Sequence, residues 1–138
     1  MNFLLDTNVV SEWVKPQPNA GLAQWMQSVD EESLFLSVIS VAELRYGIDR
    51  MASGKRRSRL DEWVRYELPM RFEGRILLVD PSIADTCGRI VRRVEVLGRP
   101  IEVMDAFLAA TAEVHRLTLV TRNVQHFTIL KSVLNPWK

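Results

Sequence analysis

The chain has 138 residues, of which 47% are hydrophobic and 25% charged, and 18 basic residues stand against 17 acidic ones. This composition excludes a disordered chain and suffices for a hydrophobic core. The length is too short for two ordinary domains, so we expect a single domain over residues 1–138. The net charge of +1 neither favours nor excludes a nucleic-acid partner. We find no signal-peptide pattern, no apolar run near the roughly 20 residues of a membrane span, and only one cysteine. We therefore expect a cytoplasmic protein with no membrane partner.

Short apolar runs typical of buried strands alternate with longer stretches of helical periodicity along the chain. The pattern predicts strands at residues 3–5, 34–38, 76–79 and 117–120. It predicts helices at residues 7–15 (capped by Thr7 or Asn8), 19–29, 40–51 (capped by Ser40 and followed by a break at Gly54), 55–68, 82–98 and 104–115. This alternation indicates the α/β class, as a three-layer α/β/α sandwich around a parallel sheet of four to five strands.

Three carboxylates fall where a parallel α/β fold places its ligands. Asp6 directly follows the first strand, Glu43 is expected in a capping box with Ser40, and Asp105 is expected in the first turn of an alanine-rich helix. Strand ends and helix starts meet at one edge of such a sheet, so the three acids can share a pocket. Each acid alone is also explained by a helix cap or a strand-end turn, and only the joint pattern indicates a site.

Clustered carboxylates repel one another, and a hard divalent cation removes that repulsion. Mg²⁺ and Mn²⁺ prefer oxygen ligands and keep several waters, which suits an acidic pocket open to solvent. No spacing of cysteine and histidine indicates zinc. The three acids therefore predict a Mg²⁺ or Mn²⁺ site.

Five segments in order, FLLDTNVVSEW, LSVISVAELRYGI, GRPIEVMDAFLAATA, LTLVTRNVQHF and NPW, resemble the PIN-domain family, above all the VapC and FitB-like toxins of type II toxin–antitoxin systems. The resemblance covers essentially the whole chain. It implies a metal-dependent endoribonuclease with metal ligands at Asp6, Glu43 and Asp105. It also implies an antitoxin partner, an RNA substrate and a homodimer.

The same resemblance assigns supporting roles around these acids. Thr7 and Asn8 match the family's DTN motif, and Thr121 and Asn123 match the segment after the last strand. Many relatives have aspartate where this chain has Asn123, which keeps an oxygen but not the charge. We therefore expect one firmly held metal ion and a weak second site.

Other basic and aromatic residues have open interpretations. Arg122 and His126 are possible RNA contacts beside Asn123. The arginines of residues 89–93 and the basic residues 55–59 either bind phosphates or form a solvated face paired with acids such as Asp85 and Glu95. Trp13, Trp25 and Trp63 either stack on bases or pack in the core. By analogy with the fold, the apolar wall of an antitoxin groove is expected at Val9, Trp13, Leu44 and Ile48.

The expected reaction is hydrolysis of an RNA phosphodiester by metal-activated water, with Glu43 as the proton acceptor if a side chain takes part. Cys87 is expected inside a helix with no base beside it, so it is no nucleophile. An aspartyl phosphotransferase of the haloacid dehalogenase type needs a second acid where Asn8 stands. A catalytically weak PIN module that mainly binds its antitoxin and, through it, DNA is the remaining alternative.

Overall fold

The computed structural model describes all of residues 1–138, and its centre is a parallel sheet of five strands. The strands are β1 (Phe3–Leu5), β2 (Leu34–Ser37), β3 (Ile76–Leu77), β4 (Thr118–Val120) and β5 (Val133–Leu134). Their order is β3-β2-β1-β4-β5, and every neighbouring pair is parallel. The predicted parallel sheet of four to five strands is confirmed. All four strands located from the sequence are present, β1 with the predicted bounds and β2, β3 and β4 with shorter ones, and the apolar pattern does not locate β5.

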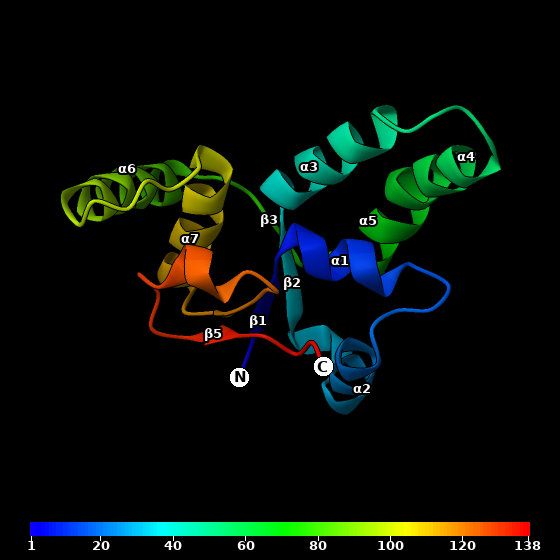
Figure 1. Ribbon diagram of the computed structural model, residues 1–138, viewed down its shortest axis with the longest axis horizontal. Coiled ribbons are helices and arrows are strands. Elements are labelled where there is room, and N and C mark those ends of the chain that lie inside the picture. Colours follow the sequence, from blue (N-terminus) through cyan, green and yellow to red (C-terminus); the bar gives the residue numbers. More distant parts are fainter.

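Seven α-helices cover the two faces of the sheet. They are α1 (Thr7–Trp13), α2 (Ala20–Ser28), α3 (Val38–Asp49), α4 (Lys55–Glu62), α5 (Leu68–Arg71), α6 (Pro81–Val96) and α7 (Val103–His115). A π-helical segment, Trp63–Glu67, joins α4 to α5, and short 3-10 turns lie at Glu31–Ser33 and Val124–Phe127. Helices α6 and α7 lie on one side of the sheet, and α1, α3, α4 and α5 lie on the other (Figure 1). The three layers predicted from the sequence are thus present.

The alternation of side chains along β1 divides the apolar core between these two sides. Phe3 and Leu5 pack with the helices α1 to α5, whereas Leu4 packs with α6 and α7. The alanines of α7 are buried in the second core, where their small side chains let the helix lie close to its neighbours. Cys87 of α6 is buried in that core, as expected, and its thiol is free.

Several helix starts differ from the predicted ones because an earlier side chain caps the helix. Asp6, not Thr7 or Asn8, caps α1 and accepts a hydrogen bond from the Thr7 backbone N–H. Asp80 caps α6 by accepting from the Ile83 N–H, so this helix begins at Pro81 and not at Ser82. Proline is well suited to that first helical position because its missing N–H has no intrahelical partner there.

The predicted capping box at Ser40 is wrong. Strand β2 ends at Ser37, whose hydroxyl accepts a hydrogen bond from the Ile39 N–H and caps α3. Ser40 is buried inside α3 and its hydroxyl has no hydrogen-bond partner. Glu43 consequently lies in the second turn of α3, not in the first. The helix also ends at Asp49, before the break expected at Gly54, and Gly54 instead precedes α4.

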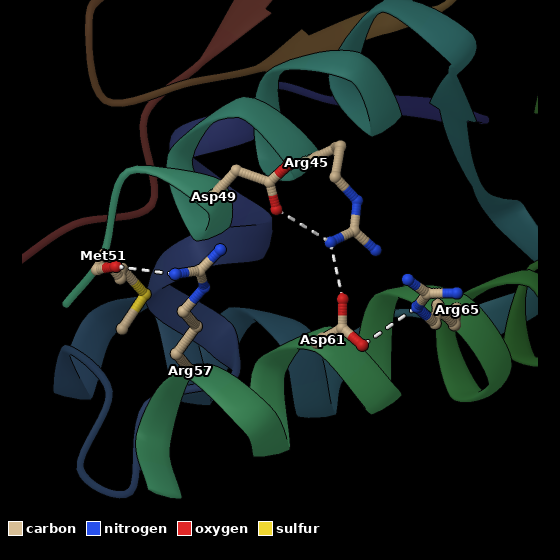
Figure 2. Close-up of polar contacts among 6 residues, drawn as sticks. All are labelled: Arg45, Asp49, Met51, Arg57, Asp61 and Arg65. Carbon is tan, nitrogen blue, oxygen red and sulfur yellow. Dashed lines mark hydrogen bonds and ion pairs between the residues drawn. The ribbon is translucent and has the colours of Figure 1, made fainter. Parts of the chain in front are cut away.

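Ion pairs connect α3 to α4 on the solvent side of this layer. The Arg45 guanidinium contacts Asp61 at 2.6 Å and Asp49 at 3.1 Å, and Asp61 also pairs with Arg65 at 2.9 Å (Figure 2). A further hydrogen bond joins Arg57 to the carbonyl of Met51 in the loop between the helices. These contacts orient the helix that carries Glu43.

No helix in this fold has both the length and the apolar character that crossing a membrane requires.

Candidate active site

Asp6 lies at the carboxyl end of β1, beside the end of β4. The Asp6 backbone N–H donates to the Val120 carbonyl, and the next residue of that strand end, Thr121, donates its hydroxyl to Asp6 Oδ2 at 2.8 Å. Both side chains are buried. The parallel pairing of β1 with β4 therefore places Thr121, 115 residues away in sequence, against the first acid.

Asn8 connects these two strand ends. Its amide nitrogen lies 3.4 Å from both Asp6 Oδ2 and Thr121 Oγ1, and its oxygen accepts from the Arg122 N–H. The Asn123 N–H in turn donates to Thr121 Oγ1 at 3.0 Å. We infer that Asn8 and Thr121 orient Asp6.

Glu43 projects from α3 toward α1. Its Oε1 accepts a hydrogen bond of 2.5 Å from the Thr7 hydroxyl. Thr7 follows Asp6 directly, so the short β1–α1 junction brings the second acid next to the first. The expected support by Thr7 thus takes the form of a direct contact with Glu43.

Asp105 lies in the first turn of α7, as predicted from the sequence. Its Oδ2 is 3.6 Å from His126 Nδ1, and His126 belongs to the turn after β4. His126 is therefore next to the acids and not in an unrelated loop.

Except for Thr121, these side chains line one pocket of about 790 Å³ at the carboxyl edge of the sheet. The residues predicted for the site that line it are Asp6, Thr7, Asn8, Glu43, Asp105, Arg122, Asn123 and His126. Thr121 is fully buried behind the pocket and reaches it through Asp6. The sequence-based expectation that acids from distant segments share one pocket agrees with this geometry, while their catalytic roles stay predictions.

Burial and mutual repulsion disfavour the charged forms of the three acids. Burial is the largest cause that raises the pKa of Asp6, and the charge of Asp105 adds to it, against hydrogen bonds from Thr121 and Thr7 that lower it. Burial also raises the pKa of Glu43, with further contributions from the charges of Asp6 and Glu102.

The pKa of Asp105 is raised in the same way. Burial is again the first cause, and the charges of Glu43 and Glu102 act in the same direction, whereas His126 lowers this pKa. No lysine or arginine forms an ion pair with any of the three acids. A cation in this pocket would therefore relieve a real electrostatic cost.

The chemistry of these donors fits a hard, hydrated divalent ion. The available ligands are carboxylate and amide oxygens, which Mg²⁺ and Mn²⁺ prefer. No three Asp, Glu, His or Cys side chains are gathered so closely that all could hold one ion directly. Mg²⁺ is commonly held by one or two carboxylates and completes its shell with water, so the pocket suits an ion bound partly through water.

Among the pocket residues that the sequence pattern does not identify, two bear on the chemistry of the site. The first, Glu102, precedes α7, lines the pocket and places its charge near Glu43 and Asp105. It makes no side-chain cap for α7. Its place three residues before Asp105 could have indicated it, since the N-cap residue and the third residue of a helix lie close together.

The second is Trp137, which lines the pocket from the segment after β5. Nothing in the local sequence indicates this, because the position depends on how residues 135–138 return across the fold.

Most of the other aromatic and basic candidates are occupied by structural contacts. Trp13, Trp25 and Trp63 pack against the apolar core, which favours the packing interpretation over base stacking. The arginines of α6 pair with acids: Arg89 with Asp85, Arg92 with Glu95 and Arg93 with Glu113.

Two apolar grooves lie beside α1, α3 and α4. One, of about 440 Å³, includes Leu44, Ile48 and Trp63, and the other, of about 520 Å³, includes Trp13 and Trp63. Val9 is fully buried and lines neither groove, so its expected place in a groove wall is wrong.

The fold and the pocket together define an α/β protein with an acidic, oxygen-rich site at the carboxyl edge of its parallel sheet. The chain belongs to the PIN-domain family, because the family model described as "PIN domain" matches residues 3–129.

Individual relatives extend over almost the whole chain. It is 39% identical to "Toxin FitB" of Neisseria gonorrhoeae over 98% of both chains, and 33% identical to "VapC ribonuclease Y4jK" of Sinorhizobium fredii over 99% of this chain and 98% of that protein. Among solved structures, "Structure of FitAB bound to IR36 DNA fragment" contains a chain that is 37% identical, with a TM-score of 0.91 over 99% of this chain and 96% of that one.

Proposed function

We propose that this protein is the ribonuclease toxin of a toxin–antitoxin pair and that it hydrolyses RNA with a bound Mg²⁺ or Mn²⁺ ion. The observation that carries the proposal is the pocket in which Asp6, Glu43 and Asp105 meet without a neutralising lysine or arginine. The similarity to a chain named a VapC ribonuclease supports RNA as the substrate. The cytoplasm is the compartment in which such a substrate would be met.

Asp6, Glu43 and Asp105 would hold the ion, in part through its bound water, with Asn123 and Glu102 at its periphery. The ion, when bound, supplies an activated water and stabilises charge on the scissile phosphate. Thr121 and Asn8 keep Asp6 in one orientation by their hydrogen bonds. Thr7 holds Glu43 by a hydrogen bond, and Glu43 would accept the proton of the attacking water if a side chain takes part.

The rim of the pocket is suited to a polyanion. Lys15, Arg99 and Arg122 line it above the acidic floor. Lys15 pairs with Glu12 and Arg99 donates to Thr128, whereas no acid pairs with the Arg122 side chain. Phosphates of an RNA strand would contact this rim while one phosphodiester reaches the acids.

The antitoxin is the proposed protein partner. The solved FitAB structure is a complex bound to DNA, and its matching chain covers almost all of this one. We propose that the two apolar grooves bind an apolar antitoxin segment, through Trp13, Trp63 and Leu44. A homodimer of this chain stays a prediction, to be checked by light scattering of the purified protein.

The decisive experiment compares the wild type with Asp6→Asn in growth arrest on induction and in Mn²⁺-dependent cleavage of RNA. We expect the substitution to abolish both, because it removes a charge from the centre of the site. Asp85→Asn is the matched control, since Asp85 is an exposed acid paired with Arg89 on α6. Equal toxicity of wild type and Asp6→Asn would refute the nuclease and favour a module that only binds its partner.

A further inference from the structure

Arg122 lies on the pocket rim and pairs with no carboxylate, and the other rim arginine without an acidic partner, Arg99, donates to the Thr128 hydroxyl. Arg122 is exposed, lines the pocket and directly follows Thr121, which binds Asp6. Its guanidinium carbon lies 5.9 Å from the ring centroid of Trp137. The guanidinium donates no hydrogen bond within the fold, so its five N–H groups are available at the rim, where its charge also acts on Glu12.

Trp137 is held in place by the backbone around it. The Asn19 amide nitrogen donates to the Lys138 carbonyl at 2.8 Å, and Asn19 Oδ1 accepts from the Lys138 N–H at 3.1 Å. The Trp137 N–H donates to Asn135 Oδ1 at 3.0 Å. The Trp137 ring is partly buried and packs against the apolar core on the α1–α5 side, so both its backbone and its ring are held by the fold.

Gly21 allows this close docking. A Cβ atom at Gly21 would lie 2.6 Å from the Pro136 carbonyl oxygen and 2.7 Å from the Lys138 nitrogen. Real Cβ atoms essentially never approach this closely, so the segment that carries Trp137 can lie where it does only above a glycine.

We propose that Trp137 is a positioning residue, which holds the Arg122 guanidinium at the rim so that it binds one backbone phosphate of single-stranded RNA next to the acids. This inference rests on the proposed ribonuclease function and adds the residue that prepares the phosphate contact. A guanidinium over an aromatic ring keeps its donor edges free, and these edges match the geometry of a phosphate. An arginine held in this way loses less conformational freedom on binding than a free one. A backbone phosphate carries no base identity, so the contact orients the strand without selecting its sequence.

The test is a double-mutant cycle on RNA binding. The affinity of a labelled oligouridylate is measured by fluorescence anisotropy in EDTA, so that binding is read without cleavage, for the wild type, Trp137→Leu, Arg122→Gln and the double variant. We expect Arg122→Gln to weaken binding about tenfold and to lower the slope of log K against log salt by about 0.7, the value for one phosphate contact on a single strand. Trp137→Leu should reproduce most of both effects, and the double variant should lose little more than Arg122→Gln alone.

Two further variants separate positioning from general damage. Trp137→Phe keeps an aromatic face and should retain the wild-type salt slope. Tyr66→Leu removes another exposed aromatic ring, 70% exposed and outside the pocket, and should leave RNA affinity unchanged.

The outcomes are distinct. Unchanged RNA affinity of Trp137→Leu overturns the inference while the ribonuclease proposal stands. Additive losses in the double variant also overturn it, because they mean that Trp137 contacts RNA independently of Arg122. A wild type that neither binds nor cleaves RNA defeats the inference together with the proposed function.

Discussion

The Thr7 hydroxyl donates a 2.5 Å hydrogen bond to Glu43 Oε1, and this contact joins the first helix of the chain to the third. It is the one hydrogen bond that lowers the otherwise raised pKa of Glu43. Thr7 thereby orients Glu43 and partly offsets the rise in its pKa that burial causes.

Replacing Thr7 by valine should uncouple Glu43 from α1. Valine keeps the shape of threonine but removes the donor, so Glu43 loses its orientation. We expect kcat/KM for RNA cleavage to fall about 10- to 100-fold, as is typical when a residue that orients a metal ligand is lost. The measurement is the initial rate on a fluorogenic RNA at saturating Mn²⁺.

The control is Thr7→Ser, which keeps the hydroxyl and should retain most of the activity. Equal rates for the valine variant and the wild type would show that the contact between Thr7 and Glu43 does not matter for the reaction.

The stability of the metal-free protein should fall as pH rises above the ordinary range of carboxyl groups. Burial raises the pKa of Asp6, Glu43 and Asp105 above the ordinary values of 3.8, 4.5 and 3.8, so the folded chain holds protons that the unfolded chain has released. Their contribution to the free energy of unfolding is complete below the unfolded pKa values and is lost as pH rises through the folded ones.

Urea unfolding in EDTA at a series of pH values measures this loss. Asp6→Asn should give a flatter dependence than the wild type, while Asp85→Asn should follow the wild type because Asp85 lies outside the pocket. A wild type whose free energy of unfolding rises with pH over the range in which these acids ionise would contradict the raised pKa values of the pocket.

Adding Mn²⁺ should restore the stability that the metal-free protein loses as the three pocket acids ionise. Ligand binding to the folded state alone stabilises it by about 2.7 kcal/mol at a concentration of 100 times Kd. Because protons compete with the ion for the carboxylates, the gain in Tm should be larger at neutral pH than in acid. Thermal unfolding with and without Mn²⁺ measures this gain in Tm. An unchanged Tm at neutral pH would count against a metal ion in this pocket.

The sequence predicted the layers, and it predicted that Asp6, Glu43 and Asp105 can share one pocket, because both follow from where strands end and helices begin. Apolar runs mark the strands, and an acid directly after such a run, like Asp6, lies at the carboxyl edge of the sheet. The position of Glu43 in α3 was less certain. The end of β2 at Ser37 is decided by its pairing with β1 and β3, which no local signal reports.

The parts that could not be predicted depend on long-range contacts. The edge strand β5 has two residues and is recognised only by its pairing with β4. Trp137 reaches the pocket because residues 135–138 dock on the start of α2, a contact across more than a hundred residues. The π-helical segment between α4 and α5 likewise has no sequence signature that identifies it.

Asn123→Asp should strengthen metal binding. Asn123 lines the pocket and its side chain makes no hydrogen bond in the fold, so an aspartate fits there and adds a further negative charge to the pocket. Calorimetric titration with Mn²⁺ should give one firm site in the wild type and a tighter or second site in the variant. Glu102→Gln should weaken Mn²⁺ binding, because it removes a negative charge from the pocket. Two equally tight Mn²⁺ sites in the wild type would contradict the prediction of one firmly held ion.

Gly21→Ala and Gly47→Ala should have opposite effects on stability. A Cβ atom at position 21 collides with backbone atoms of Pro136 and Lys138, which cannot move aside as a flexible side chain would. We expect Gly21→Ala to lower the free energy of unfolding by about 1–3 kcal/mol, the usual cost of forcing extra atoms into a packed site.

Gly47 lies within α3 and is exposed, and no atom lies within 4 Å of the place that an alanine Cβ would take. Gly47→Ala should therefore raise the free energy of unfolding by about 0.5–1 kcal/mol. Urea unfolding of both variants measures the difference, and a neutral Gly21→Ala would show that residues 135–138 are not docked on α2 as tightly as these contacts require.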